Sequence, residues 1–220
     1  DTAAKRAQSG DNEAKALSNV LNKILLSLQD GNAARTVDID KEEKKIFDGL
    51  QLLTAKPVLY VCNVEEDAAG DGNSQSVRVA EMATGEGASS VVISAAIESE
   101  VAQLDAEERT EFLETLGLEE TGLTRIIRAG YELLDLITFF TVGPKEARAW
   151  TVRRGAKAPQ SAGVIHTDFE RGFIRAETIA YDDFISGGGE QGAKDNGKMR
   201  AEGKEYVTHD GDVYHFRFNV

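Results

Sequence analysis

The stretch GAKDNGKM, residues 192–199, has the spacing G-x-x-x-x-G-K at which a glycine-rich loop holds the phosphates of a nucleotide. Such a loop needs a buried strand before it, a helix after it, and a Ser or Thr after the Lys to ligate Mg²⁺. Met199 stands at that last position without an oxygen for the metal, and the preceding SGGGEQ is typical of a loop. No other G-x-x-x-x-G-K-[ST] occurs in the 220 residues, so the octet is rejected as a phosphate site.

A more specific pattern is CNVEED, residues 62–67, at the carboxyl end of the apolar run PVLYV. Ligands of parallel α/β sheets bind outside the carboxyl ends of the strands. P-loop GTPases carry N-K-x-D at such a strand end, where the Asn holds the loop and touches the base, and the Asp accepts two guanine protons. Asn63, Val64 and Glu66 stand at the matching positions here, with Glu in place of the Asp.

The exchange of Asp for Glu bears on which purine is bound. Adenine has a lone pair at N1 and no 2-amino group, so a carboxylate aimed at this edge gains nothing and is repelled. A longer acid that retracts from the base suits adenine better, with an amide or backbone carbonyl accepting a proton of the 6-amino group. Each mismatched polar contact costs about 1–3 kcal/mol, which is enough for about ten- to hundredfold discrimination.

A second apolar run, SSVVI, follows about 30 residues later and ends in Ser94, Ala95 and Ala96. These three residues match the S-A-K/L loop that closes over the base in the same enzymes. Two such loops at the carboxyl ends of neighbouring parallel strands predict a site for a purine at that edge of the sheet.

The elements that must position these loops follow from the spacing of apolar residues. Three- and four-residue steps predict helices, and short continuous runs rich in β-branched residues predict buried strands. Their alternation is typical of a parallel α/β sheet, although two strands are too few to complete one. The predicted helices are 17–28, 40–53, 74–84, 99–116 and 121–136, and the predicted strands are 57–63 and 89–96.

The last third of the chain has the pattern of a small α+β domain. ITFFTV and ARAWTV, separated by the turn signal GPKE, predict a β-hairpin. GFIRAETI and the terminal VYHFRFNV predict two further strands. PQSAGVIHTDF predicts a short helix, YDDFI a helical turn, and residues 186–198 a loop.

Composition limits the class of protein. The chain is 41% hydrophobic and 29% charged, as in globular proteins, and no apolar run approaches the ~20 residues of a membrane span. A net charge of -13 argues against indiscriminate nucleic-acid binding, although residues 138–220 carry 12 basic and 12 acidic side chains. The single cysteine, Cys62, excludes an intrachain disulfide and fits a reducing cytoplasm.

Other residues of chemical interest are weaker candidates. His166, His209 and His215 lack the spacing of metal ligands, and no Cys cluster accompanies them. A set of cations and aromatics in the last third suggests an RNA-binding sheet face, although strand alternation would bury half of it. The set comprises Trp150, Arg153, Arg154, Lys157, Arg171, Phe173 and Arg175.

The run RAWTVRRGAKAPQSAGVIHTDFERGFIRAETIAYDDFI, with GKMRAEGKEY and the terminal DGDVYHFRFNV, resembles the C-terminal TGS domain of the YchF (Obg-like) ATPases. With NVEE, SAA and the helical N-terminal segment, the resemblance extends across essentially all 220 residues. It implies a fold of the α/β plus α+β type in three parts. These are part of a helical, coiled-coil insertion in 1–55, the second half of a P-loop nucleotide-binding domain in 56–136, and a ubiquitin-like β-grasp TGS domain in 137–220.

The resemblance also implies a function: a cytoplasmic, ribosome-associated P-loop ATPase that prefers ATP to GTP. Its expected partners are the ribosome (50S or 70S) and RNA, with no membrane. The asparagine would fix and read the base, the following valine would meet adenine's amino group through its backbone, and the glutamate would replace the guanine-selecting acid. The SAA loop would form the wall over the base. The implied nucleotide-binding residues are Asn63, Val64, Glu66, Ser94, Ala95 and Ala96.

In that family the phosphate loop, the switch segments and the Mg²⁺ ligands all precede the helical arm, whereas this chain begins inside the arm. We therefore expect no catalytic residue here and no ATP hydrolysis by the 220 residues alone, because charge stabilisation at the transferring phosphoryl group dominates such catalysis. Two alternatives stay open. One is a non-catalytic ribosome- or RNA-binding fragment, and the other is a GTP-dependent, nucleic-acid-binding protein that tolerates Glu in place of Asp.

Overall fold

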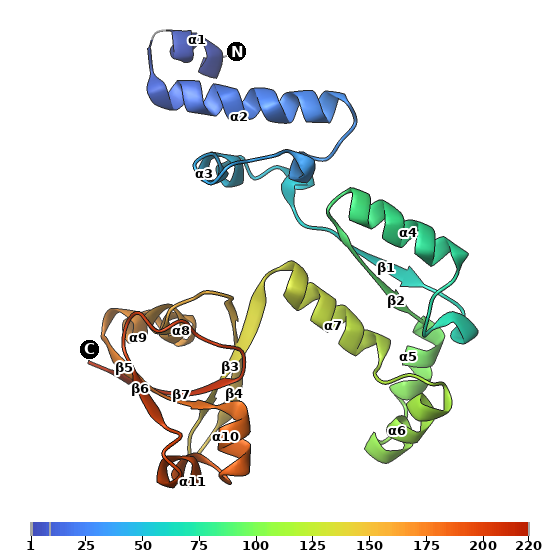
Figure 1. Ribbon diagram of the computed structural model, residues 1–220, viewed down its shortest axis with the longest axis vertical. Helices are drawn as coiled ribbons and strands as arrows, with labels where there is room; N and C mark the ends of the chain where they lie inside the picture. The colour runs from blue at the N-terminus through green and yellow to red at the C-terminus, as the bar shows by residue number, and fades with distance from the viewer. Residues whose placement is uncertain (1, 9, 220) are drawn as a thin grey trace. The chain divides into compact units, whose positions relative to one another are not determined.

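The computed structural model describes residues 2–8 and 10–219 (Figure 1). The chain divides into two compact units, one running up to Leu133 and the other from Leu134 onward. Each unit has its own sheet and its own buried apolar clusters, so the fold is of the mixed α and β kind that the sequence predicts. Within the described ranges, no helix is both long and apolar enough to cross a bilayer.

The first unit opens with helices. Asp11 caps the long helix α2 by accepting a hydrogen bond from the Ala14 N–H at 3.1 Å, and the helix predicted at 17–28 is confirmed. The second predicted helix is shorter than expected, because the Asp40 side chain first caps the N–H groups of Glu42 and Glu43 in a separate turn. The elements are α1 (Thr2–Gln8), α2 (Asn12–Gln29), η1 (Ala34–Thr36), α3 (Lys44–Gly49) and η2 (Leu53–Ala55).

Two parallel strands follow, both close to their predicted positions. β1 (Leu59–Asn63) pairs in register with β2 (Ser89–Ile93), and the connection between them carries η3 (Glu66–Ala68) and α4 (Ser74–Gly85). Asn73 and Ser76 start α4 with a reciprocal capping box. Among the described residues, no further strand pairs with β1 or β2, so both outer edges of this sheet are open.

A charged contact links the helical segment to this sheet. Arg35, in η1, lies 2.6 Å from the Glu86 carboxylate, which also accepts a hydrogen bond from the Tyr60 hydroxyl at 3.0 Å. That hydrogen bond, together with burial, raises the pKa of Tyr60. The arginine side chain is largely enclosed, so the ion pair fixes η1 against the end of α4 and the middle of β1.

The helix predicted over 99–116 is wrong as a single element. The structure has α5 (Ala95–Val101) and α6 (Ala106–Thr115), followed by α7 (Gly122–Leu133). The break falls at Asp105, whose side chain accepts hydrogen bonds from the Glu107 and Glu108 N–H groups while Glu108 reaches back to the Asp105 N–H. This capping box starts a new helix where apolar spacing alone suggested continuity.

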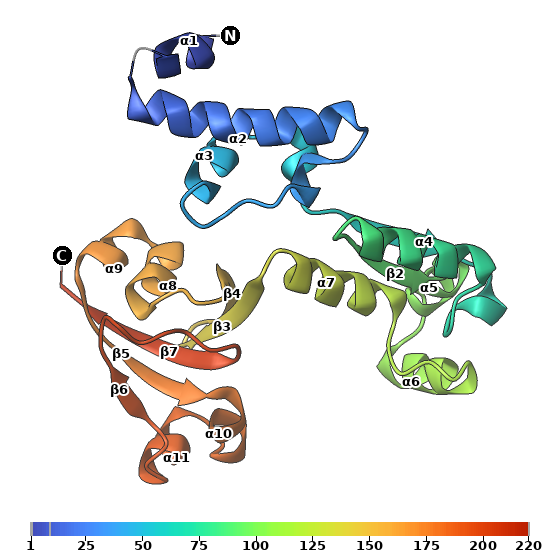
Figure 2. The same cartoon turned by 45° about the horizontal axis from the view of Figure 1, so that its top comes forward.

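Five strands form the sheet of the second unit, in the order β4-β3-β7-β5-β6 (Figure 2). β3 and β4 pair antiparallel around the turn at 143–146, which confirms the predicted hairpin. β3 also pairs in parallel with β7, and β5 runs antiparallel to both β7 and β6. The strands are β3 (Leu136–Val142), β4 (Ala147–Arg153), β5 (Phe173–Ala180), β6 (Arg200–Glu202) and β7 (Asp212–Phe218).

Short helices pack on both faces of this sheet: α8 (Ala158–Ile165) and α9 (Thr167–Arg171) on one, α10 (Tyr181–Ser186) and α11 (Glu190–Asp195) on the other. α11 lies within the predicted loop 186–198, so that prediction is wrong. A Cβ at Gly192 would lie 1.8 Å from the Gly187 carbonyl oxygen, so glycine lets the two short helices meet and bury Ala193. The rejected octet therefore begins inside a helix rather than after a strand.

A buried polar cluster holds the end of the second unit together. The Asp212 carboxylate, 3% exposed, accepts hydrogen bonds from the Tyr206 hydroxyl at 3.0 Å, the Tyr214 hydroxyl at 3.2 Å and the His209 N–H at 2.9 Å. Burial and the neighbouring carboxylate raise the pKa of Tyr206 to about 12, and burial raises the pKa of Tyr214 further. Both phenols are therefore neutral in the folded protein well above pH 10.

We expect the protein to lose stability as the pH rises from about 10 toward 12, because the unfolded phenols ionise near 10 while the folded ones stay protonated. A raised folded pKa stabilises the native state below the unfolded pKa, and this stabilisation is lost as the pH rises through the folded pKa. Urea unfolding midpoints between pH 8 and pH 11.5 measure the effect. Tyr206→Phe should flatten the decline and exposed Tyr181→Phe should not; equal slopes in all three proteins would contradict the assignment.

Candidate functional site

The parallel register of β1 and β2 brings the two predicted loops together. Asn63, the last residue of β1, is paired with Ile93, the last residue of β2, so both loops leave the same edge of the sheet. Beyond the strands, the Val64 N–H donates a hydrogen bond to the Ile93 carbonyl at 2.9 Å and extends the pairing by one step. The residues predicted from two motifs about 30 positions apart thus lie side by side.

One side chain connects the loops directly. The Asn63 Oδ1 accepts a hydrogen bond from the Ala95 N–H at 2.9 Å, which is the first amide of the SAA loop inside α5. Asn63 itself is exposed, as are Ala95 and Ala96. The Asn63 side chain therefore ties the two loops together through its oxygen, on a residue that is exposed as a whole.

Ser94 supplies a polar atom that the protein leaves unsatisfied. It is 2% exposed, and its Oγ has no hydrogen-bond partner among the described residues. It stands at the N-cap of α5 without capping the helix. A buried hydroxyl without a partner costs about 1–3 kcal/mol, so this position favours a bound molecule that supplies one. The residues present thus fit a polar ligand at this strand end.

Val64 and Glu66 lie differently from one another. Val64 is buried and its N–H is engaged, which leaves its carbonyl as the backbone group able to accept an amino proton. Glu66 is exposed at the start of η3, and its carboxylate contacts no other described residue through a hydrogen bond or ion pair. The structure therefore brings Asn63, Val64 and the SAA loop together, and leaves the acid outside this network.

Sequence reasoning missed a third element of the site. The Glu98 carboxylate, on α5, accepts hydrogen bonds from the N–H groups of Gly122 at 2.6 Å and Leu123 at 3.1 Å, at the start of α7. Arg125, also on α7, donates to the Ala69 carbonyl in the loop that follows β1. The first turn of α7 therefore braces both loops. No spacing rule announces a contact across 24 residues, although an acid facing a helix N-terminus is favourable once the fold is known.

The suggested RNA-binding face of the second unit is not a continuous basic surface. Phe173 belongs to the buried apolar cluster beneath α8 and α9, and Trp150 packs against that cluster. The Arg148 guanidinium carbon lies 4.4 Å from the centre of the Trp150 ring. Several cations are paired with carboxylates instead of being free for phosphate. These pairs are Arg154–Asp135, Lys157–Glu205, Arg175–Glu177 and Arg217–Glu177.

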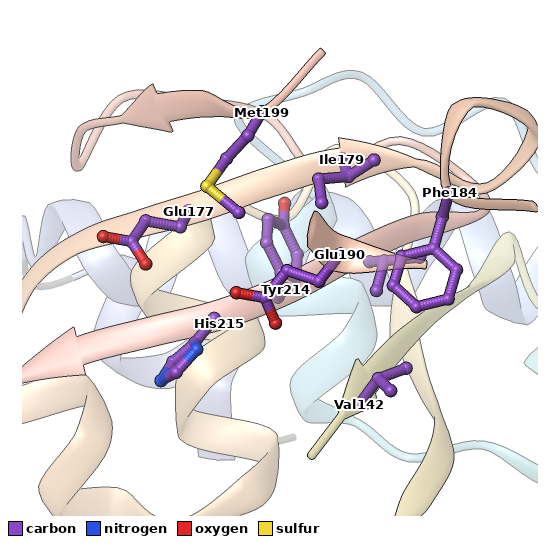
Figure 3. A pocket seen from close by; sticks show the side chains of 9 residues that line it. Val142, Glu177, Ile179, Phe184, Glu190, Met199, Tyr214 and His215 are labelled. Atoms are coloured by element: carbon purple, nitrogen blue, oxygen red, sulfur yellow. The ribbon is translucent and has the colours of Figure 1, made fainter. Parts of the chain in front are cut away.

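Figure 3 shows a small cavity on the face of this sheet that α10 and α11 cover. Glu177, Glu190 and His215 line it together with the apolar side chains of Met199 and Phe184. Its volume of about 10 Å³ has room for one water and not for a nucleotide. Across the described ranges, no group of three or more His, Cys, Asp or Glu side chains is arranged to hold a metal ion.

The chain is similar in sequence to known proteins along most of its length. A family model named YchF-GTPase_C, described as a protein of unknown function (DUF933), matches residues 136–219. The ribosome-binding ATPase YchF of Pasteurella multocida is 56% identical over 98% of this chain, and that of Bacillus subtilis is 51% identical over 99%. The chain spans 59% and 60% of the length of these two relatives.

A solved structure gives the same result at the level of the fold. The YchF GTPase of Schizosaccharomyces pombe superposes with a TM-score of 0.81 at 35% identity, covering 93% of this chain and 55% of that one. The match spans both units, and the family model covers nearly all of the second. Over the part of its relatives' length that it spans, the chain is therefore similar to members of the YchF family in both sequence and fold.

Proposed function

We propose that the chain is the base-recognition half and C-terminal module of a cytoplasmic, ribosome-associated P-loop ATPase that hydrolyses ATP in preference to GTP. The observation that carries the proposal is the 2.9 Å hydrogen bond from the Ala95 N–H to Asn63 Oδ1. It joins two loops at the carboxyl ends of parallel strands, where ligands of such sheets bind. The names of the bacterial relatives, ribosome-binding ATPase, supply the partner and the reaction.

The residues take complementary roles in this proposal. Asn63 holds the SAA loop through its oxygen and meets the base with its amide nitrogen. The Val64 carbonyl accepts a proton of adenine's 6-amino group, a contact that guanine's O6 cannot make. Ser94 offers its unpartnered Oγ beside the ring, and Ala95 and Ala96 form the wall over it.

The domain arrangement is part of the same proposal. Residues 1–55 belong to a helical insertion, 56–136 to the nucleotide-binding domain, and 137–220 form a TGS module of β-grasp type. The module and the helical segment contact the ribosome, including its RNA. The 220 residues contain no G-x-x-x-x-G-K-[ST] motif. In this proposal, Mg²⁺ and the phosphates are held by other segments of the full-length protein. Those segments supply charge stabilisation at the transferring phosphoryl group.

Asn63→Ala tests the base site in the full-length protein. The substitution removes both the Ala95 tether and the base contact, so ATP affinity should fall about tenfold or more, equivalent to at least ~1.4 kcal/mol. Titration of a fluorescent ATP analogue measures it. Asn22→Ala, at an exposed position of α2, is the matched control and should bind as the parent does. Unchanged affinity in Asn63→Ala would remove the site from consideration.

Glu66→Asp tests purine selection. Restoring the shorter acid should raise GTP affinity relative to ATP by about tenfold, because guanine's N1–H and 2-amino protons then meet a carboxylate at the right distance. Competition of ATP and GTP for the parent and the variant gives the ratio directly. Exposed Glu65→Asp is the neighbouring control. Equal ATP and GTP affinities in the parent would show that Glu at this position does not select adenine.

The 220-residue chain should release no phosphate from ATP on its own. A phosphate-release assay with Mg²⁺ present, at chain concentrations high enough to detect very slow turnover, makes the measurement. The full-length protein serves as the positive control. Phosphate release by the chain that Asn63→Ala abolishes would mean that these residues contain catalytic groups and would overturn the division of labour proposed above.

A further inference from the structure

Glu98 is hydrogen-bonded at both ends. Its backbone N–H donates to the Ser94 carbonyl at 3.1 Å, within the first turn of α5. Its carboxylate accepts from the Gly122 N–H at 2.6 Å and the Leu123 N–H at 3.1 Å, one oxygen to each donor. A single residue thus connects the SAA loop to the N-terminus of α7, where a negative charge is also favoured by the helix dipole.

The start of α7 also packs against the residue just before Ser94. A Cβ at Gly122 would lie 2.9 Å from both Ile93 Cβ and Ile93 Cγ2, and 3.0 Å from Glu98 Oε1. Gly122 is buried, so nothing separates the helix backbone from the end of β2. The Ile93–Ser94–Ala95 stretch is therefore held from two sides. Val64 and Asn63 hold it across the sheet, and the start of α7 holds it through the packing of Gly122 and the hydrogen bonds to Glu98 of α5.

The Asn63 hydrogen bond and the Glu98 carboxylate contribute differently to the position of α5. α5 has seven residues, too few to be stable by itself, so its orientation depends on what holds it. The Asn63 bond fixes the loop at one amide only. The bidentate carboxylate fixes the other end of the same turn through charge-assisted hydrogen bonds, which are stronger and more directional than neutral ones.

We propose that Glu98 is a positioning residue for base recognition, which holds the Ser94–Ala96 wall in place by anchoring α5 to the first turn of α7. The inference rests on the proposed function, since it takes the wall to lie over a purine. Glu98 touches neither base nor phosphate in this scheme. Its effect reaches the ligand through the Ser94 carbonyl and the Ala95 amide, so it controls how well the base is held and not how the phosphates are bound.

The first test uses the 220-residue chain without ligand. Hydrogen exchange at the Ala95 amide should be about tenfold faster in Glu98→Gln, which keeps one acceptor, and faster still in Glu98→Ala, which keeps none. Glu100→Gln, an exposed acid on the same helix, should exchange as the parent does. Circular dichroism establishes that each variant is folded. Exchange at Ala95 that is unchanged in both Glu98 variants would overturn the proposal.

The second test uses the full-length protein and two probes, ATP and ribose 5′-triphosphate, which lacks the base. Glu98→Gln should weaken ATP binding about five- to tenfold and leave ribose triphosphate unchanged, because only the base meets the wall. Equal weakening of both probes would mean a general structural defect and would sink the positioning role.

The same titration distinguishes failure of the proposed base site from failure of the positioning role of Glu98. If Asn63→Ala weakens ATP binding and Glu98→Gln does not, the base site stands and the role of Glu98 is wrong. If the parent protein binds ATP no better than ribose triphosphate, the proposed base site itself fails, and the inference fails with it.

Discussion

The hydrogen bond between Asn63 and Ala95 is the interaction on which the organisation of the site depends. Parallel pairing of β1 and β2, extended by one step at Val64, places two loops at one edge but does not determine how the rest of the loops meet. A single amide side chain reaching 2.9 Å across the gap determines it. An asparagine suits this task because it accepts with one atom and donates with the other, so that it can hold the protein and still face a ligand.

Around that bond the structure distributes two kinds of support. Polar contacts tie the loops to α7 through Glu98 and Arg125, and an ion pair ties the helical segment to the sheet through Arg35 and Glu86. Apolar packing stabilises each part within itself. The cluster around Val20 holds the N-terminal helices together, and the cluster around Ile97 holds α5 and α6 together. Directional contacts thus set the orientation of parts whose stability comes from burial.

Much of this could be predicted from the sequence, and the exceptions have physical reasons. The strand ends and the meeting of Asn63 with the SAA loop follow from apolar runs and parallel pairing, both of which are local or general rules. The D-x-x-E pattern of Asp105 and Glu108 indicates a new helix start, but the apolar spacing on both sides of it favours one continuous helix. The Glu98 contact could not be predicted from the sequence, because nothing within α5 specifies what its carboxylate faces. The cation–carboxylate pairs depend on which residues face each other across neighbouring strands, as Arg217 and Glu177 do. Composition alone cannot predict such pairs.

The sheet of the first unit has a consequence for handling the protein. β1 and β2 pair only with each other in the described part of the chain, and Val61, Val77 and Met82 beside them are substantially exposed. Unpaired strand edges next to apolar side chains are templates for joining one molecule to another. We therefore expect the 220-residue chain on its own to self-associate as its concentration rises, through strand edges that lack a partner within the described residues.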